Sequence, residues 1–177
     1  MPSGKVHDRM TVGAAVLAVP AWWLFTPAPA DPTTCAALVV ATLFSGLMLS
    51  PDLDLDSSIY HRWGPIRFLW WPYQKLIPHR SRFSHSFVLA PLLRVLYFLG
   101  LLWLLLRGGV WVASQFVPLD RNAISRQATD LFITFWKTHP KHFQMTALGI
   151  FIGSALHCGA DIIWTSLKHL RRQAMRL

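Results

Sequence analysis

The sequence contains no glutamate and few charged residues of any kind. All eight acidic residues are aspartates, and charged residues make up 14% of the 177-residue chain, against about 25% in an average soluble domain. Soluble helices usually carry glutamate on their hydrated faces, so its absence argues against extensive hydrated helix surface. Cysteine is also scarce: Cys35 and Cys158 are isolated within apolar runs, which favours buried free thiols over a disulfide.

The sequence is instead rich in apolar, aromatic and basic residues. Hydrophobic residues make up 53% of the chain, nine residues are tryptophan, and the formal charge is +9. A basic balance suits either nucleic acid or an anionic lipid surface. Here the basic residues are spread over the predicted loops, and tryptophan together with basic residues is typical of the membrane–water interface. We therefore expect membrane lipid as a partner and no nucleic-acid partner.

Long apolar segments predict an all-α, polytopic membrane protein that forms a single domain over residues 1–177. About four transmembrane helices are expected, over residues 11–25, 33–49, 87–106 and 143–166. Between the second and third helices, residues 52–83 are expected to form an interfacial loop segment. One extra amphipathic helix is expected over residues 120–136.

Two details of this assignment depend on short motifs. The Gly108-Gly109 pair is expected to end the third helix. The first apolar segment also fits a signal peptide, with Ala28-Pro29-Ala30 as a cleavage site. Retention and cleavage of this segment therefore both stay open.

The distribution of basic residues predicts an orientation. If both termini and the 52–83 segment share a side, that side holds eleven Lys and Arg residues and the other holds five. The positive-inside rule then places these parts in the cytoplasm, for a protein of the bacterial inner (plasma) membrane or another internal membrane.

Three aspartates follow the second apolar segment at a period of two: Asp52, Asp54 and Asp56. In an extended segment their carboxylates would project from one face. Like charges this close raise one another's pKa unless a cation lies among them. The alternative is an ordinary Asp-rich cap after a helix.

Histidines at two further places could complete a metal site on the same side of the membrane. His79 and His85 end the interfacial segment, and imidazole is a common ligand of transition metals. His157 and Asp161 are four residues apart in the last apolar segment, so they share a helix face. Ionisable residues within a span are costly and usually functional, although a hydrogen-bonded His–Asp pair could simply join helices.

These motifs, in this order, resemble those of two families. The matching positions are His7, Asp52, Asp54, His79, Arg80, His85 and His157-Cys-Gly-Ala-Asp161. The pattern is similar to that of the YdjM-like membrane-bound metal-dependent hydrolases, and to that of a related group of cyanobacterial membrane metal-binding proteins. His79 and His85 are six residues apart, one more than in the YdjM-like pattern, which favours the cyanobacterial-type group. More distantly, the His-x-x-x-Asp pattern is similar to that of zinc-dependent phospholipase C.

The resemblance and the ligand types together predict a membrane-embedded metal-binding domain that faces the cytoplasm. The predicted ligands are His7, Asp52, Asp54, His79, His85, His157 and Asp161. Seven ligands exceed the need of one ion, so two divalent ions are expected, with Zn, Mn, Fe and Mg all open.

The leading hypothesis for function is a metal-dependent hydrolase of a phosphoester, with a lipid-linked substrate as one option. In this hypothesis Asp56 acts as a ligand or general base, and Arg80 and Arg82 face the anionic oxygens. The alternative is a non-catalytic membrane metal-binding or metal-transport protein that uses the same ligands.

Overall fold

The computed structural model describes residues 3–78, 81 and 86–175, and this part of the chain consists of helices joined by short turns. In order, the elements are α1 (Gly4–Phe25), α2 (Pro32–Leu47), η1 (Pro51–Asp54), α3 (Ser58–Arg62), η2 (Gly64–Trp70), α4 (Trp71–Leu76), α6 (Leu89–Ala113), α7 (Arg121–Thr138) and α8 (Pro140–Ala174). No strand occurs in these residues, so the all-α prediction is confirmed.

Side-chain caps set the starts of two helices close to where the sequence predicted them. Asp31 accepts hydrogen bonds from the backbone N–H and the hydroxyl of Thr33 at the start of α2, at 2.9 and 2.7 Å. These bonds hold the pKa of the Asp31 carboxyl below its usual value. Asp120 caps α7 by accepting from the N–H groups of Asn122 and Ala123.

Two predicted boundaries were wrong. Helix α6 runs through Gly108-Gly109 and ends only at Ala113. Each glycine costs about 1 kcal/mol relative to alanine in a helix, but the apolar residues on both sides favour keeping the backbone hydrogen bonds. Helix α8 begins at Pro140, where the missing N–H of proline costs nothing in the first turn, and it continues to Ala174.

Within the described residues, two helices are long and apolar enough to cross a membrane: α6 and α8. Helix α2 has 16 residues, about 24 Å of helix, which is less than the ~30 Å of a bilayer core. Helix α1 has 22 residues, but charged residues lie in its first turns. The coarse prediction of membrane-type helices thus has support in two of the four segments, and four spans remain a prediction.

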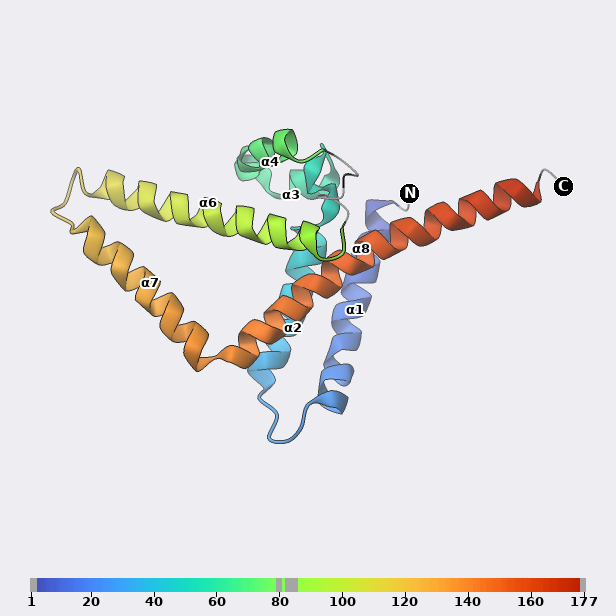
Figure 1. The fold of residues 1–177 in the computed structure, drawn as a ribbon, viewed down its shortest axis with the longest axis horizontal. Coiled ribbons are helices and arrows are strands. Elements are labelled where there is room, and N and C mark those ends of the chain that lie inside the picture. Colours follow the sequence, from blue (N-terminus) through green and yellow to red (C-terminus); the bar gives the residue numbers. More distant parts are fainter. Residues whose placement is uncertain (1–2, 79–80, 82–85, 176–177) are drawn as a thin grey trace.

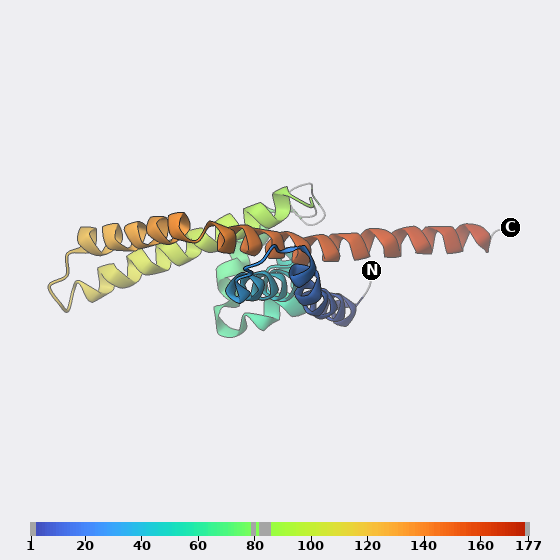
Figure 2. The ribbon, with the colours of Figure 1, turned by 90° about the horizontal axis from the view of Figure 1, so that it is seen from below.

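Helix α8 is the element on which the other long helices are arranged. It crosses α2 and α1, and its C-terminal part extends beyond them (Figure 1). In the view turned by 90°, α1 and α2 lie on one side of α8 (Figure 2). Helices α6 and α7 return the chain from the short helices to the start of α8.

Glycines of α8 allow its backbone to touch that of α2. A Cβ atom on Gly149 would lie 2.5 Å from the carbonyl oxygen of Leu38, and one on Gly153 would lie 2.7 Å from that of Thr42. Beside them, the hydroxyl of Ser45 donates a hydrogen bond to the carbonyl of Ile150 at 2.7 Å. Small residues at a helix crossing allow this close approach.

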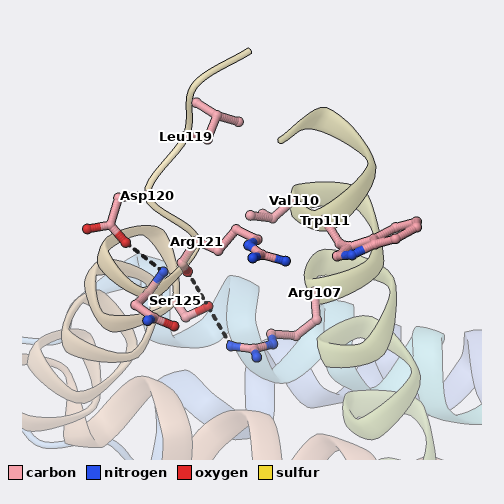
Figure 3. Close-up of a pocket in the computed structure, with 8 residues that line it drawn as sticks. Arg107, Val110, Trp111, Leu119, Asp120, Arg121 and Ser125 are labelled. Carbon is pink, nitrogen blue, oxygen red and sulfur yellow. Dashed lines mark hydrogen bonds between the residues drawn. The ribbon is translucent and has the colours of Figure 1, made fainter. Parts of the chain in front are cut away.

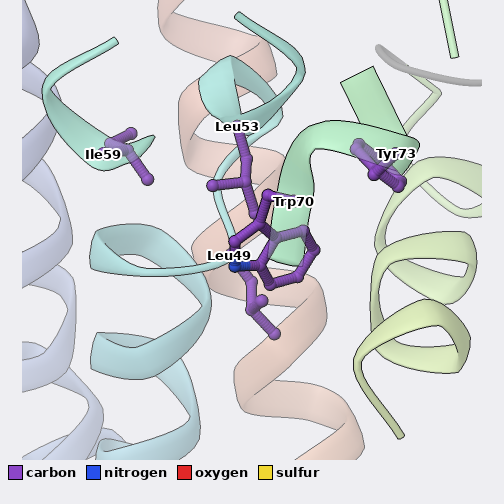
Figure 4. Packing of buried hydrophobic residues seen from close by; sticks show 5 residues of the cluster. All are labelled: Leu49, Leu53, Ile59, Trp70 and Tyr73. Atoms are coloured by element: carbon purple, nitrogen blue, oxygen red, sulfur yellow. The ribbon is translucent and has the colours of Figure 1, made fainter. Parts of the chain in front are cut away.

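Residues 52–76, which belong to the segment predicted to be interfacial, fold into short helices around a buried apolar cluster. This cluster consists of Leu49, Leu53, Ile59, Trp70 and Tyr73 (Figure 4). Leu53 and Trp70 are completely buried, and burial raises the pKa of Tyr73 to about 12. Leu53 of η1 packs in the same cluster as Leu49, which follows α2, so the η1 turn is held against the end of α2.

The α2–α8 crossing can be tested with a pair of glycine variants of α8. Gly153→Ala should lower the free energy of unfolding by about 1–3 kcal/mol, because the added methyl overlaps backbone atoms of α2. Gly159→Ala is the matched control, since nothing lies within 4 Å of a Cβ at that position. Thermal unfolding of both variants in the same detergent measures the difference. Equal stability of the two would contradict the packing described here.

Candidate metal centre

Three buried side chains from the two ends of the chain meet beside the α1–α8 contact. His7 comes from α1, and His157 and Asp161 come from α8. One ligand atom from each lies within 4.8 Å of the ligand atoms of the other two. The order of the motifs predicted that residues of the first and last helices are ligands of one metal site. The structure brings these three residues together.

The local packing explains why each side chain points inward. His157 and Asp161 are one turn apart on the α8 face that continues from the glycine contact with α2. His7 lies one turn before the buried Thr11, whose side chain fills the space left by the missing side chain of Gly46. The tight contacts of α2 with α1 and with α8 therefore fix both sides of the group.

Distances within the group suit a small divalent ion. His7 Nε2 lies 3.4 Å from Asp161 Oδ1, and His157 Nε2 lies 3.7 Å from Asp161 Oδ2. Two tetrahedral ligands that each bind an ion at ~2.1 Å are separated by about 3.4 Å. The imidazole rings of His7 and His157 stack with their centroids 3.9 Å apart.

Several polar atoms of the group are buried without a hydrogen-bond partner among the described residues. They are His7 Nδ1, His157 Nε2 and both carboxylate oxygens of Asp161. Buried polar atoms nearly always have a partner, and each one without a partner needs an explanation. A cation between His157 and Asp161 would satisfy three of these four atoms, so these residues fit a metal ion.

Ser50 and Asp52 join the group from the turn after α2. Ser50 Oγ lies 2.8 Å from His157 Nδ1, and both side chains are buried. Metal-binding histidines usually have their second ring nitrogen held by an oxygen in this way, because the contact fixes the ring orientation and the tautomer. Asp52 Oδ1 lies 3.4 Å from His157 Nε2, on the side of the group that is partly open to solvent.

Burial also favours the form of His7 that binds metal. Loss of solvation, the largest cause, lowers the pKa of His7, and the neighbouring His157 lowers it further, while nearby aspartates oppose the shift. The imidazole of His7, which precedes the apolar part of α1, is therefore held toward its neutral form. Neutral imidazole is the metal ligand.

The three aspartates of the Asp52–Asp56 motif do not share one face, so the prediction of an extended segment was wrong. Pro51 starts a 3-10 turn, η1, which is closed by hydrogen bonds from Leu53 N to Ser50 O and from Leu55 N to Asp52 O. Asp52 lies at the histidine group and Asp54 is buried. Asp56 is largely exposed and pairs with His61 at 2.7 Å.

The remaining predicted site residues, His79, Arg80, Arg82 and His85, lie outside the described residues. Their assignment as ligands and as anion-binding residues stays a prediction from the sequence. The described part of the site thus contains His7, Asp52, His157 and Asp161 from the predicted set. Asp54 is buried in the same turn as Asp52, and Asp56 pairs with His61 at the surface.

Two residues beside the group, Ser50 and Arg94, have partners that the sequence did not predict. Ser50 lies two residues before Asp52, and its role becomes visible only in the structure, where its hydroxyl contacts Nδ1 of His157. Arg94 is fully buried in α6, where its Nη2 donates to Ser154 Oγ at 2.8 Å, one turn before His157. Ser50 and His157, like Arg94 and Ser154, are far apart in the sequence, and no pattern in a single sequence predicts such contacts. Only the fold shows them.

The helical fold and this thiolate-free His–Asp group define a helical protein of metal-binding type. Consistent with that, the chain belongs to the family described as uncharacterized metal-binding protein (DUF2227), whose model matches residues 2–171. The match supports the metal-binding part of the predicted resemblance and not membership of the YdjM-like hydrolases. No curated protein and no solved structure matches the chain.

The contact between Ser50 and His157 yields a test. Ser50→Ala should weaken the binding of a divalent ion by about 10- to 100-fold, because the ring of His157 loses the partner that orients it. Ser45→Ala is the matched control: Ser45 is equally buried and bonds to α8, but it donates to a backbone carbonyl rather than to a histidine. Competition with a chelating dye measures both affinities. If both variants lost affinity equally, the effect would be one of packing alone.

Proposed function

We propose that this chain is a membrane-bound metal-dependent hydrolase of phosphoesters, with His7, His157 and Asp161 as the protein ligands of a divalent ion. The observation that carries the proposal is the set of buried His157 and Asp161 atoms without hydrogen-bond partners, together with His7 Nε2 at 3.4 Å from Asp161. Three protein ligands leave one position open, as in catalytic zinc sites.

The residues around the group have roles that suit hydrolysis. In such a site a divalent ion supplies activation of water at neutral pH and polarisation of a phosphoryl oxygen. In this proposal Asp52 accepts a proton or acts as a further ligand, which its position 3.4 Å from His157 and its partial exposure to solvent support. The buried charge of Arg94, fixed by Ser154 beside His157, favours an anionic substrate.

The predicted residues of the 79–85 segment extend this proposal. His79 and His85 would hold a second ion with Asp54, and Arg80 and Arg82 would contact phosphoryl oxygens, as the sequence predicts. A lipid-linked substrate agrees with the two membrane-type helices, and a cytoplasmic site agrees with the count of basic residues. Oxygen and imidazole ligands leave Zn, Mn, Fe and Mg open.

A second candidate is non-catalytic metal binding or transport by the same ligands. The observation that favours it is burial: His7, His157 and Asp161 are all at most 7% exposed. A bound ion would be shielded there, as in sites that store or carry a metal.

Metal content tests the shared part of both candidates. We expect the purified full chain to retain a divalent metal, and His157→Gln and Asp161→Asn to lose most of it, because each removes a ligand. His169→Gln and Asp130→Asn are matched controls, since both residues are exposed and lie outside the site. Elemental analysis by mass spectrometry gives the result. A metal-free wild-type chain after growth and purification with added metals would mean that the His–Asp pair only joins helices.

Hydrolysis then separates the two candidates. The metal-loaded chain should cleave a chromogenic phosphodiester or phosphomonoester, and His157→Gln should reduce the rate to background while His169→Gln leaves it unchanged. The rates are followed by absorbance in detergent. A metal-loaded chain that cleaves neither these esters nor phospholipids would favour the non-catalytic candidate.

A further inference from the structure

We propose that a cavity at the corner between α6 and α7 binds the phosphate of an anionic phospholipid headgroup, through the guanidinium groups of Arg107 and Arg121. The cavity has a volume of about 330 Å³, within the range of small-ligand pockets. It is lined by Arg107, Val110, Trp111, Leu119, Asp120, Arg121, Asn122 and Ser125 (Figure 3). Nothing in this proposal depends on the metal centre.

Two arginines from different helices converge on this cavity. Arg107 is held in place because its Nη1 donates to Ser125 Oγ at 2.9 Å and its guanidinium lies 5.5 Å from the centre of the Trp103 ring. The side chain of Arg121 extends from the first residue of α7 toward α6 (Figure 3), and within the described part of the chain it has no hydrogen bond or ion pair. Paired guanidinium groups bind phosphate oxygens in a bidentate manner.

Asp120, the acidic residue of the cavity lining, offsets only one of the two positive charges. Asp120 Oδ1 accepts from the N–H groups of Asn122 and Ala123, at 2.9 and 3.0 Å, so the carboxylate is engaged as the cap of α7. Among the described residues it forms no ion pair with Arg107 or Arg121. The two arginines therefore leave an excess of positive charge in the cavity, which an anion would balance.

The position of the cavity favours a lipid headgroup over free phosphate. Arg107 lies six residues before the end of α6, a membrane-type helix, and so about 9 Å from that end. Arginines near helix ends lie at headgroup level, where tryptophans such as Trp103 and Trp111 are also enriched. Val110, Trp111 and Leu119 give the cavity an apolar wall against which the glycerol and acyl part of a lipid can pack.

Lipid titration of the full chain tests the proposal. In a neutral detergent, native mass spectrometry should show phosphatidylglycerol binding at least about tenfold more tightly than phosphatidylcholine, because only the former has a net negative headgroup. Arg107→Gln/Arg121→Gln should abolish this preference. Arg126→Gln/Lys137→Gln is the matched control, since it removes the same charge from exposed positions of α7 outside the cavity and should leave the preference intact.

Three results would overturn the proposal. The first is equal affinity for the two lipids, and the second is an equal loss in both double variants. The third is displacement of phosphatidylglycerol by millimolar inorganic phosphate, which would assign the cavity to free phosphate. If the glutamine pair fails to fold by circular dichroism, Arg107→Lys/Arg121→Lys replaces it. That pair keeps both charges but loses bidentate contacts, so it should weaken phosphatidylglycerol binding severalfold, and unchanged binding would count against the site.

Discussion

The contact between the backbones of α2 and α8 is the constraint on which the rest of the structure depends. Gly149 and Gly153 have no side chains to hold the two helices apart, so α8 approaches α2 to within a backbone contact. Ser154 follows Gly153 directly, and His157 and Asp161 lie one and two turns further along α8, all three with buried side chains. The glycines therefore decide where the polar residues of α8 lie: against the end of α2, where Ser50 and Asp52 are, and against the start of α1, where His7 is.

Burial of so many ionisable groups in one place is costly unless each is neutral, paired or bound to an ion. In this protein Ser50 contacts His157 and Ser154 contacts Arg94, but His157 Nε2 and both carboxylate oxygens of Asp161 have no hydrogen-bond partner among the described residues. The apolar cluster around Trp70 and Leu53 supports this arrangement from outside, because it holds the turn that carries Asp52. A chain that kept these groups only as links between helices would gain little, since replacement of buried ion pairs by apolar residues is often neutral or stabilising. The arrangement is therefore better explained by metal binding, which also agrees with the family of the chain.

Much of the helical content could be predicted, because it depends on local patterns. The apolar and amphipathic segments are patterns of neighbouring residues, and they placed α2 and α7 to within two residues at each end. The start of α8 at Pro140 was not predicted. The predictions were wrong where packing and neighbouring residues outweighed the preference of a short sequence motif. Gly108-Gly109 usually interrupts a helix, but α6 continues through both glycines. The Asp52–Asp56 alternation is typical of a strand, but Pro51 and the burial of Leu53 produce a 3-10 turn that sends the three carboxylates in different directions.

The sequence by itself determined the class of helices, the kinds of ligand and the order of the motifs. These are properties of composition and spacing: His157 and Asp161 must share a face of a helix, and a chain with isolated cysteines supplies oxygen and imidazole ligands. Only the tertiary structure decided which residues meet. His7 and Asp161 are separated by almost the whole chain, and their contact exists because small residues bring α1, α2 and α8 together. The same holds for Ser50 beside His157 and for Arg107 and Arg121 at one cavity, because proximity between distant residues is set by packing and is not encoded in any local pattern.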